Sequence, residues 1–546
     1  MKRYLLGRIL FSVFSLLVVI MVVMLLVFSL IHRDVIFQTD DTWNKKALND
    51  RSYYEYQQYQ RYGYLEFENY TIFLKNKYEP LYGSDYTKNA DYKADKAAIQ
   101  DAATWYLNTS VQEFVAQKTG IKDLPAFIEE NAGKPDAWKG KGWQIKYLEP
   151  QLTPRGKVKD GGNAYLLLIH EKSVFSRLVT YLGQLFTIET VNDVTDPNLT
   201  DRYVRVEKDP YNGLFAVVGS GTTHKYLLYF DGRFPFIHQN WLHLNLGTSY
   251  TQYRGSEITN VITEPQGDKI YRVTQYPAYL GTDEYVNLPF DIHTATYNPN
   301  MDAWTAKRFT DNYTKVNDSV DGLSMLENSF VIGIIATIIA YFLGLPVGIT
   351  MARRKDGLFD KIGNGYIIFI MAVPSLAYIF MFAAIGTKLF GLPYKFANAQ
   401  VKILAYFLPT ISLALREIGG LMKWMRRYMI DQMNSDYVKF ARAEGLSEKE
   451  IYRKHISPNA MIYLVHGIPG SILGCLTGAI LTERIYSVPG VGNLLTNAIN
   501  SHDNGIIVAC TVFYTTLSII SVILGDLLLA KYDPRISLSS SKGGGR

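Results

Sequence analysis

At 546 residues the chain is longer than one ordinary domain, so at least two structural units are expected. The formal net charge of +6 is small for this length, and the basic residues form no stripe of the kind that binds nucleic acid. Cys475 and Cys510, the two cysteines, both lie inside apolar runs and lack the spacing of a metal site. The polar part of the chain has no cysteine and must fold without disulfides, which favours a bacterial surface over an animal ectodomain.

An uncharged apolar run at residues 9–31 is long enough to cross a bilayer core of about 30 Å. Lys2, Arg3 and Arg8 precede this run, and acidic residues follow soon after its end. Because basic residues collect on the cytoplasmic side of membrane spans, this order predicts a helix with a cytoplasmic N-terminus. A cleaved signal peptide is the alternative, but it would have a shorter apolar core and a small-residue cleavage site.

Residues 32–325 form a polar, tyrosine-rich block that is expected to be an extracytoplasmic α+β domain. Its apolar spacing predicts a helix at 94–118, with Gly120 placed to stop it. Turn residues between apolar runs also predict two hairpins, which pair 226–230 with 234–237 and 258–263 with 269–274. The tyrosines are either a recognition surface or ordinary packing. No catalytic or metal-binding pattern occurs in the block, so no enzyme is expected there.

The C-terminal part contains further apolar runs long enough to span a membrane, and these are 328–352, 362–387, 403–422, 460–482 and 506–525. With the first run they predict six spans and place both termini in the cytoplasm. The loops at 353–361 and 423–455 are rich in Lys and Arg, as cytoplasmic loops are. The loop at 388–402 is predicted outside although it carries three lysines. Proline inside these runs is expected to be tolerated in helices that pack against other helices.

The cytoplasmic segment at 434–460 predicts two short amphipathic helices separated by a turn at Gly445. Ser447, with Glu450 three residues later, predicts a capping box at the start of the second helix. A helix–turn–helix that projects from the membrane with a charged face is either a docking element or a solvated loop. Residue chemistry alone leaves both interpretations open.

This segment resembles the EAA loop of binding-protein-dependent ABC permeases of the oligopeptide/dipeptide subfamily. The matching residues are Asp436, Tyr437, Val438, Ala441, Arg442, Ala443, Gly445, Leu446, Ser447, Glu448, His455, Asn459 and Ala460. A second resemblance lies at the exit of the fifth span, on Glu483, Pro489, Gly490 and Gly492, and a third at residues 533–536. The resemblance covers residues 1–31 and about 325–537.

The resemblance implies an α-helical polytopic membrane protein, with six transmembrane helices in a type I ABC importer bundle and an inserted α+β domain. The expected divisions are 1–31, 32–325, a permease core at 326–537 with a coupling loop at 423–459, and a tail at 538–546. The insert is far larger than in common members of the family. A second departure is Arg416-Glu417 inside the fourth span, which is either a functional intramembrane polar site or a pair that reaches toward the interface.

The resemblance further implies that the protein moves peptides across a bacterial plasma membrane, with oligopeptides as the expected substrate and dipeptides or metal chelates as the alternative. The sequence has no Walker A motif, so ATP and magnesium are expected in two cytoplasmic ATP-binding partner subunits and no cofactor in this chain. The other implied partners are a second homologous permease, an extracellular substrate-binding lipoprotein and membrane lipid, without nucleic acid. A membrane receptor is a competing interpretation, but no cytoplasmic stretch is large enough for an output domain.

Overall fold

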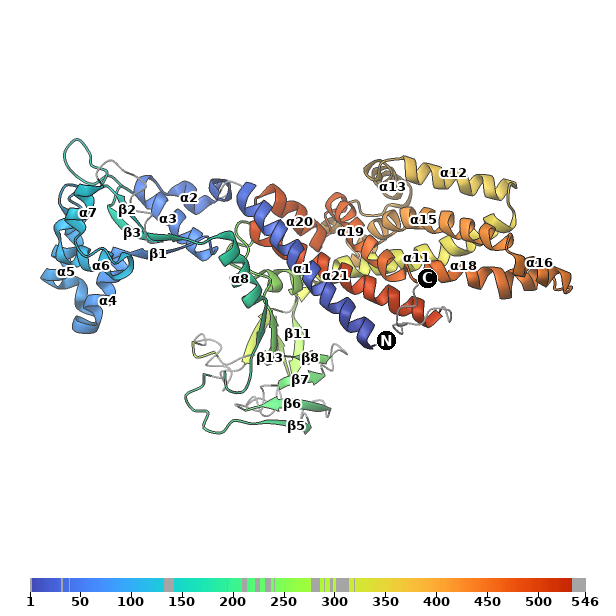
Figure 1. Cartoon of the computed structure of the whole chain (residues 1–546), viewed down its shortest axis with the longest axis horizontal. Helices are drawn as coiled ribbons and strands as arrows, with labels where there is room; N and C mark the ends of the chain where they lie inside the picture. Colours follow the sequence, from blue (N-terminus) through green and yellow to red (C-terminus); the bar gives the residue numbers. More distant parts are fainter. Residues whose placement is uncertain are drawn as a thin grey trace, which may run out of the picture.

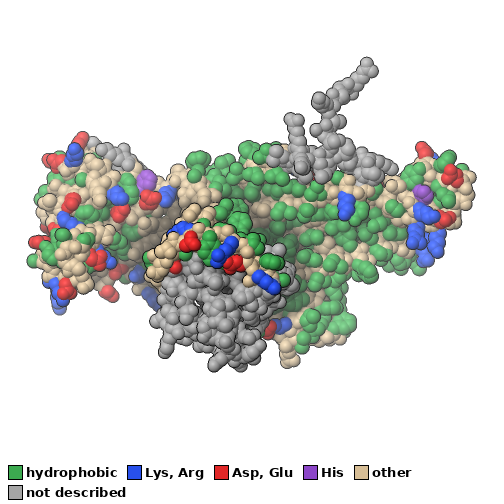
Figure 2. All heavy atoms as spheres, turned by 90° about the horizontal axis from the view of Figure 1, so that it is seen from below, with side chains coloured by type: hydrophobic (Ala, Val, Ile, Leu, Met, Phe, Trp, Pro, Cys, Tyr) green, Lys and Arg blue, Asp and Glu red, His purple; other side chains and the backbone are tan. Residues whose placement is uncertain are grey.

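The computed structural model describes residues 2–532 except 31–32, 39, 132–141, 194, 209–213, 221–225, 231–236, 240, 276–284, 289, 295–297, 301–313 and 319. The molecule is elongated, with a helical bundle at one end and a helix-rich lobe of the insert at the other, while a strand-rich lobe projects from the middle (Figure 1). The bundle surface seen in Figure 2 is mostly hydrophobic, and charged side chains gather near the two ends of the molecule. An apolar band between polar ends is the pattern of a protein that crosses a bilayer.

Four segments of the described chain are helical over a length and apolarity sufficient to cross a membrane, namely Gly7–Ser29, Met325–Arg353, Lys402–Met433 and Asn504–Tyr532. They correspond to helix α1 (Lys2–Leu30), α11 (Met325–Arg353), α14 with α15 (Lys402–Ala405 and Phe407–Met433) and α21 (Asn504–Tyr532). Helices α1 and α21 pack side by side, and Arg8 near the start of α1 lies 3.0 Å from Asp526 near the end of α21. The first turns of α1 and the last turns of α21 therefore lie at the same end of the bundle.

The other two predicted spans are bent helix pairs. Helices α12 (Leu358–Ala372) and α13 (Ser375–Phe390) meet at 113°, so the run 362–387 is not the single helix that its apolarity suggested. Pro374 lies in the break, where it lacks an N–H donor and disfavours helical geometry in the preceding Val373, whose ψ is 130°. Helices α18 (Ser457–Val465) and α19 (Ile468–Tyr486) bend by 48°.

The first lobe of the insert packs short helices around a three-stranded antiparallel sheet in the order β1-β3-β2. Its strands are β1 (Leu65–Asn69), β2 (Gln144–Leu148) and β3 (Tyr165–Glu171). Its helices are η1 (Arg33–Phe37), α2 (Asp41–Lys45), α3 (Leu48–Arg61), α4 (Tyr70–Tyr82), η2 (Gly83–Lys88), α5 (Ala90–Ala98), η3 (Trp105–Leu107), α6 (Thr109–Thr119) and α7 (Leu124–Glu130). Several tyrosines are at most 9% exposed inside it, including Tyr54, Tyr59, Tyr62, Tyr64, Tyr70, Tyr78 and Tyr92. These tyrosines serve packing.

The single helix predicted at 94–118 is wrong, because the chain breaks after α5 and restarts at α6. The side chain of Asn108 accepts a hydrogen bond from the Val111 amide at 3.1 Å, which caps the new helix. The predicted stop is confirmed, since Gly120 follows α6 with a φ of 70° in the left-handed region.

The second lobe consists mainly of short antiparallel strands. A four-stranded sheet runs β5-β6-β7-β8, and its members are β5 (Val204–Lys208), β6 (Phe215–Gly219), β7 (Tyr226–Phe230) and β8 (Ile237–Gln239). The remaining strand pairs are β4 (Phe186–Ile188) with β9 (Leu242–Leu244), β10 (Asp268–Lys269) with β15 (Val320–Asp321), β11 (Arg272–Gln275) with β12 (Tyr285–Leu288), and β13 (Phe290–Thr294) with β14 (Thr314–Asp318). The antiparallel pairing of β7 with β8 confirms a hairpin after 226–230, but Phe230 pairs with Ile237, so the second strand is 237–239 and not the predicted 234–237; residues 231–236 lie outside the described residues.

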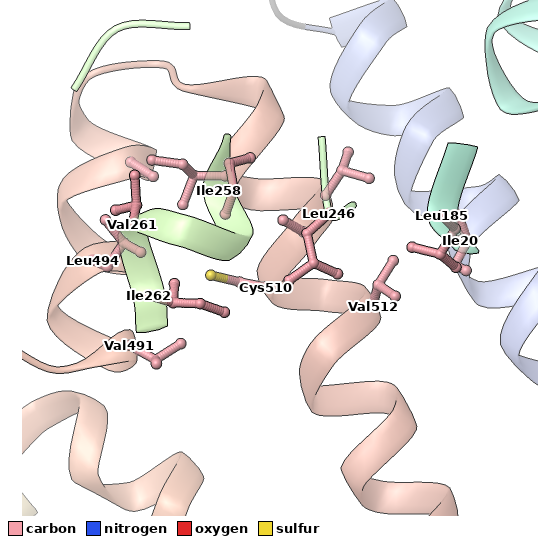
Figure 3. Packing of buried hydrophobic residues seen from close by; sticks show 14 of the residues in the cluster. Ile20, Leu185, Leu246, Ile258, Val261, Ile262, Val491, Leu494, Cys510 and Val512 are labelled. Carbon is pink, nitrogen blue, oxygen red and sulfur yellow. The ribbon is translucent and has the colours of Figure 1, made fainter. Parts of the chain in front are cut away.

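The second predicted hairpin is wrong, because residues 258–263 form a helix, α9 (Ile258–Thr263). Ile258, Val261 and Ile262 have helical spacing, and each is at most 6% exposed. Figure 3 shows these side chains directed toward Leu494 and Cys510, which belong to α20 (Val491–Asn500) and α21 of the bundle. Burial against the bundle therefore decides the structure of this β-branched run.

Candidate functional site

The predicted helix–turn–helix is present at the end of the bundle that lies farthest from the first lobe of the insert (Figure 1). It consists of α16 (Asp436–Ala443), α17 (Glu448–Glu450) and a π-helical turn, η7 (Ile451–Ile456), which leads into α18. The whole element follows α15 directly. Its position at the tip leaves one face packed on the bundle and one face outside it.

Two local motifs form the turn. The Leu446 amide donates to the Ala441 carbonyl at 3.2 Å and the Gly445 amide donates to the Arg442 carbonyl at 3.0 Å, which is a Schellman ending of α16. Gly445 has a φ of 84°, and a Cβ there would meet no atom within 4 Å. The position therefore requires glycine for its backbone conformation and not for space.

The predicted capping box is confirmed. The Ser447 hydroxyl accepts from the Glu450 amide at 3.3 Å, and the Glu450 carboxylate accepts from the Ser447 amide at 3.4 Å. The two side chains satisfy donors that the start of a helix would otherwise leave unpaired. The turn and the helix start are thus both built from residues close together in the chain.

The inner face of the loop is an apolar contact with the bundle. Val438, Ile451 and Ile456 are fully buried, Ala441 is 5% exposed, and Leu446 packs against the same cluster. Their neighbours include Met425 and Met429 of α15 and Ala352 of α11, which are also fully buried. This close-packed contact attaches the loop to α11 and α15.

The outer face carries most of the predicted docking residues. The exposed ones are Asp436, Tyr437, Arg442, Ala443, Gly445, Ser447 and Glu448, while His455 is half-buried. Across the turn, Arg442 Nε donates to Glu448 Oε1 at 2.7 Å, and this hydrogen bond raises the pKa of the guanidinium. The Tyr437 hydroxyl donates to Gln432 Oε1 at 2.8 Å.

Phe440 is a feature of this face that the sequence did not single out. Its side chain is 65% exposed on α16, between the buried Val438 and Ala441. In the sequence it lies within 439–441, which read Lys439-Phe440-Ala441 where the general EAA consensus has Glu-Ala-Ala. An exposed aromatic ring beside charged residues is typical of an anchor at a protein interface.

The second predicted motif is a polar junction around the N-terminus of α20. Glu483, fully buried at the end of α19, accepts from the Ser329 hydroxyl at 2.7 Å and from the Asn493 amide at 2.9 Å. The Ser329 oxygen in turn accepts from the Val491 amide at 3.0 Å. The Pro489 carbonyl accepts from the Asn328 side chain at 2.8 Å. The motif therefore joins α19 and α20 to the start of α11.

Both positions of the motif require glycine, because a side chain at either one would collide with atoms of this junction. A Cβ on Gly490 would lie 2.3 Å from Cδ of Glu483, and one on Gly492 would lie 2.6 Å from Cα of Ile480. Such distances leave no room for any side chain. The motif residues Glu483, Pro489, Gly490 and Gly492 are thus brought together, but away from the loop at the bundle tip (Figure 1).

The two charged residues predicted inside the fourth span do not bond each other among the interactions of the described chain. The exposed Arg416 donates to Ser375 Oγ at 3.1 Å, at the first residue of α13. Glu417 is half-buried. Arg416 is therefore tied to the bent helix pair, and a functional intramembrane role for the two residues stays a prediction.

A further ion pair, which the sequence did not predict, fixes the loop end of α15. Arg426 donates to both carboxylate oxygens of Asp360, with Nε–Oδ1 at 2.6 Å and Nη2–Oδ2 at 2.7 Å. Asp360 is 1% exposed near the start of α12. A two-pronged pair of this kind restricts orientation as well as distance. It holds the first bent pair against the helix that carries the loop.

The long apolar helices, the bent helix pairs and the protruding loop are the architecture of an integral membrane protein. The sequence model described as "Binding-protein-dependent transport system inner membrane component" matches residues 344–538. The chain is 33% identical over 553 residues to the oligopeptide transport system permease protein AmiC of Streptococcus pneumoniae, with 100% of both chains covered. It is also 33% identical over 216 residues to the dipeptide transport system permease protein DppB of Lactococcus lactis, which is 39% of this chain and 70% of the relative.

A chain of the MetNI methionine ABC transporter in an inward-facing crystal form is 11% identical, with 38% of this chain and 94% of that chain covered at a TM-score of 0.32. The full-length identity to AmiC and the family match together assign the chain. It belongs to the binding-protein-dependent transport system inner membrane components, among the permeases of peptide ABC transporters.

Proposed function

We propose that this chain is a transmembrane subunit of an importer of oligopeptides. The observation that carries the proposal is the extent of the relatives. The oligopeptide permease AmiC aligns over the whole chain, insert included, whereas the dipeptide permease DppB and the oligopeptide permease AppB of Bacillus subtilis each align over 39% of it. The large insert is thus shared with a relative named for oligopeptides. Dipeptide or metal-chelate import is the second candidate.

The proposed topology places the insert outside the cell and the loop at 434–460 in the cytoplasm. The insert connects the end of α1 to the start of α11, and the loop lies at the other end of α15. Lys402, one of the three lysines in the loop at 388–402, lies 2.8 Å from Asp321 of the insert. This ion pair supplies a partner for a lysine on the side where the charge rule disfavours it.

The proposed mechanism uses the loop as a lever. The outer face of α16, with Phe440 and Tyr437, would seat on one of two cytoplasmic ATP-binding subunits, which hold ATP and magnesium. The packed inner face would pass a movement of that subunit to α11 and α15. Binding and hydrolysis of ATP in the partners would then bias the bundle between two access states.

The remaining proposed partners follow from the same mechanism. A second, related permease would complete the translocation path, and an extracellular lipoprotein would deliver the peptide. The insert lies beside the proposed outer entrance, so we assign to it the positioning of that lipoprotein.

Reconstitution of the complete complex in proteoliposomes tests the proposal. We expect labelled peptides of about five residues to be taken up with ATP and to compete better than dipeptides or nickel chelates. Phe440→Ala should leave the complex folded but lower peptide-stimulated ATP hydrolysis, because the ring is 65% exposed and contributes little to packing within the described chain. Lys439→Ala, on the same helix, serves as a surface control. Preferential dipeptide uptake would reject the oligopeptide assignment.

A further inference from the structure

A pocket of about 290 Å³ lies where the insert meets the bundle. Its floor contains Met24 and Phe28 of α1 and Val508 of α21, and its walls come from the end of α3, from α8 (Val174–Leu185) and from the segment after β9. The pocket therefore joins apolar side chains of two spanning helices to polar side chains of the insert. Neither predicted motif contributes to it.

The pocket has an excess of positive charge. Arg61, Lys172 and Arg177 are among the described residues that line it, and no Asp or Glu is among them. Lys172 is neutralised by Glu66 at 2.9 Å, outside the lining. Neither arginine has a carboxylate partner among the described residues, and Asp503, next to a lining residue, instead accepts from the Ser249 hydroxyl and from the backbone amides of residues 250–252.

Arg177 is the central observation, because it is only 8% exposed. Its guanidinium lies 3.5 Å from the ring centre of Phe28 and 3.8 Å from that of Tyr64. Contacts with aromatic faces offset part of the cost of burying a cation, but a buried charge is normally paired with an opposite one. The arrangement leaves the guanidinium ready for an anion.

A buried acceptor without a hydrogen-bond partner lies beside it. Asn504 is fully buried and donates through Nδ2 to the Tyr64 hydroxyl at 2.9 Å, while its Oδ1 has no hydrogen-bond partner. A buried carbonyl of this kind requires a donor. The pocket therefore offers cationic groups for an anion and an acceptor for a hydroxyl or amine on the same ligand.

The surroundings of the pocket indicate the source of that ligand. Helix α8 exposes Phe175 and Val179, and β4 continues this surface with Phe186 and Ile188, all at least 54% exposed. Arg177 is the only charged residue in the segment 173–188. The neighbouring α1 exposes Leu25 and Leu26. An uncharged apolar surface that continues from a spanning helix suits the acyl region of a bilayer.

We propose that this pocket binds the headgroup of an anionic phospholipid from the outer leaflet. The phosphate is held at Arg177 and Arg61, a headgroup hydroxyl or amine donates to Asn504 Oδ1, and an acyl chain lies along the apolar surface of α1 and α8. The lipid thereby fixes the depth of the insert relative to the bundle. A basic pocket beside spanning helices is a known form of headgroup recognition.

The test uses the purified full-length chain in detergent, titrated with short-chain phosphatidylglycerol, with phosphatidylcholine or with inorganic phosphate. Binding is measured by native mass spectrometry and by the thermal unfolding midpoint. We expect phosphatidylglycerol to bind about tenfold more tightly than phosphatidylcholine, since charge-assisted hydrogen bonds are lost with the neutral lipid. Inorganic phosphate alone should produce little stabilisation.

Two variants test whether the preference for phosphatidylglycerol arises at this pocket. Thr180→Glu combined with Gln184→Glu places carboxylates on exposed positions of the pocket wall and should abolish the preference for phosphatidylglycerol without disturbing the core. Ser176→Glu, exposed on the same helix but outside the lining, should retain it. Equal binding of the two lipids to the wild type, or an unchanged preference in the double variant, would overturn the proposal. Equal stabilisation by inorganic phosphate, or by a soluble Glu-rich peptide, would assign the pocket to a soluble anion and overturn the lipid.

Discussion

At the loop end of the bundle, the hydrogen bonds that shape the turn join residues three to six positions apart, such as Leu446 to Ala441 and Arg442 to Glu448. At the insert joint, Asp503 accepts hydrogen bonds from residues about 250 positions earlier, including the Ser249 hydroxyl at 2.7 Å and the Thr251 amide at 2.8 Å. The loop therefore takes its shape from local sequence, whereas the joint exists only when the insert and the bundle are already folded against each other. This difference predicts that substitutions at the joint lower the stability of the fold, whereas substitutions in the loop leave the fold intact and disconnect transport from ATP hydrolysis.

Asp503→Ala should have the largest effect on stability. The buried carboxylate accepts from the Tyr250, Thr251 and Gln252 amides, and its loss leaves these donors unpaired at the joint. We expect the free energy of unfolding to fall by about 3 kcal/mol, as for the loss of one partner in a buried charged network. Thermal unfolding of the purified chain measures it, with the exposed Asp201→Ala as control. Equal midpoints for the two variants would contradict a joint held by Asp503.

Gly490→Ala should cause the second-largest loss of folding stability, because the new Cβ would lie 2.3 Å from the buried Glu483 carboxyl carbon. Overpacking of this kind costs about 1–3 kcal/mol, and the yield of folded protein should fall. Gly474→Ala is the matched control, since a Cβ there meets nothing within 4 Å on α19. Adding Glu483→Ala to Gly490→Ala should restore part of the lost stability if contact is the cause. A double variant as unstable as the sum of the single ones would indicate another cause.

Gly445→Arg should separate stability from coupling. Its positive φ costs a side chain about 1 kcal/mol, but the position is open, so the chain should still fold and insert. ATP hydrolysis by the assembled complex should no longer respond to peptide, since the new side chain lies on the outer face of the loop. Gly365→Ala, on α12 with nothing within 4 Å, controls for an added side chain elsewhere. Normal peptide uptake by a well-expressed Gly445→Arg variant would reject the docking role.

Arg442→Gln should have the smallest effect on stability, below about 1 kcal/mol, because the Arg442–Glu448 pair is solvent-exposed. The Schellman ending and the capping box would hold the turn without the ion pair. Thermal unfolding at low and at high salt measures its contribution, and Lys439→Gln removes the comparable exposed pair with Asp436. A loss of several kcal/mol would show that the ion pair, and not the local backbone motifs, maintains the turn.

The same distinction explains which sequence predictions succeeded. The capping box at Ser447, the stop at Gly120 and the pairing of β7 with β8 depend on neighbouring residues, and the structure confirms them. The hairpin expected at 258–274 failed because Ile258, Val261 and Ile262 are held as a helix by the bundle surface. The helix expected at 94–118 failed where an irregular segment and a new cap at Asn108 interrupt it.

The sequence by itself determined the apolar spans, the local shape of the loop and the family, because these depend on composition and on short motifs. Only the tertiary structure decided that Glu483 caps the start of α20, that Asp503 binds the insert, and that Arg177 lies buried with no carboxylate partner among the residues that the structure describes. The physical reason is that each of these polar groups is satisfied, or left unsatisfied, by residues that only the folded chain brings within hydrogen-bonding distance.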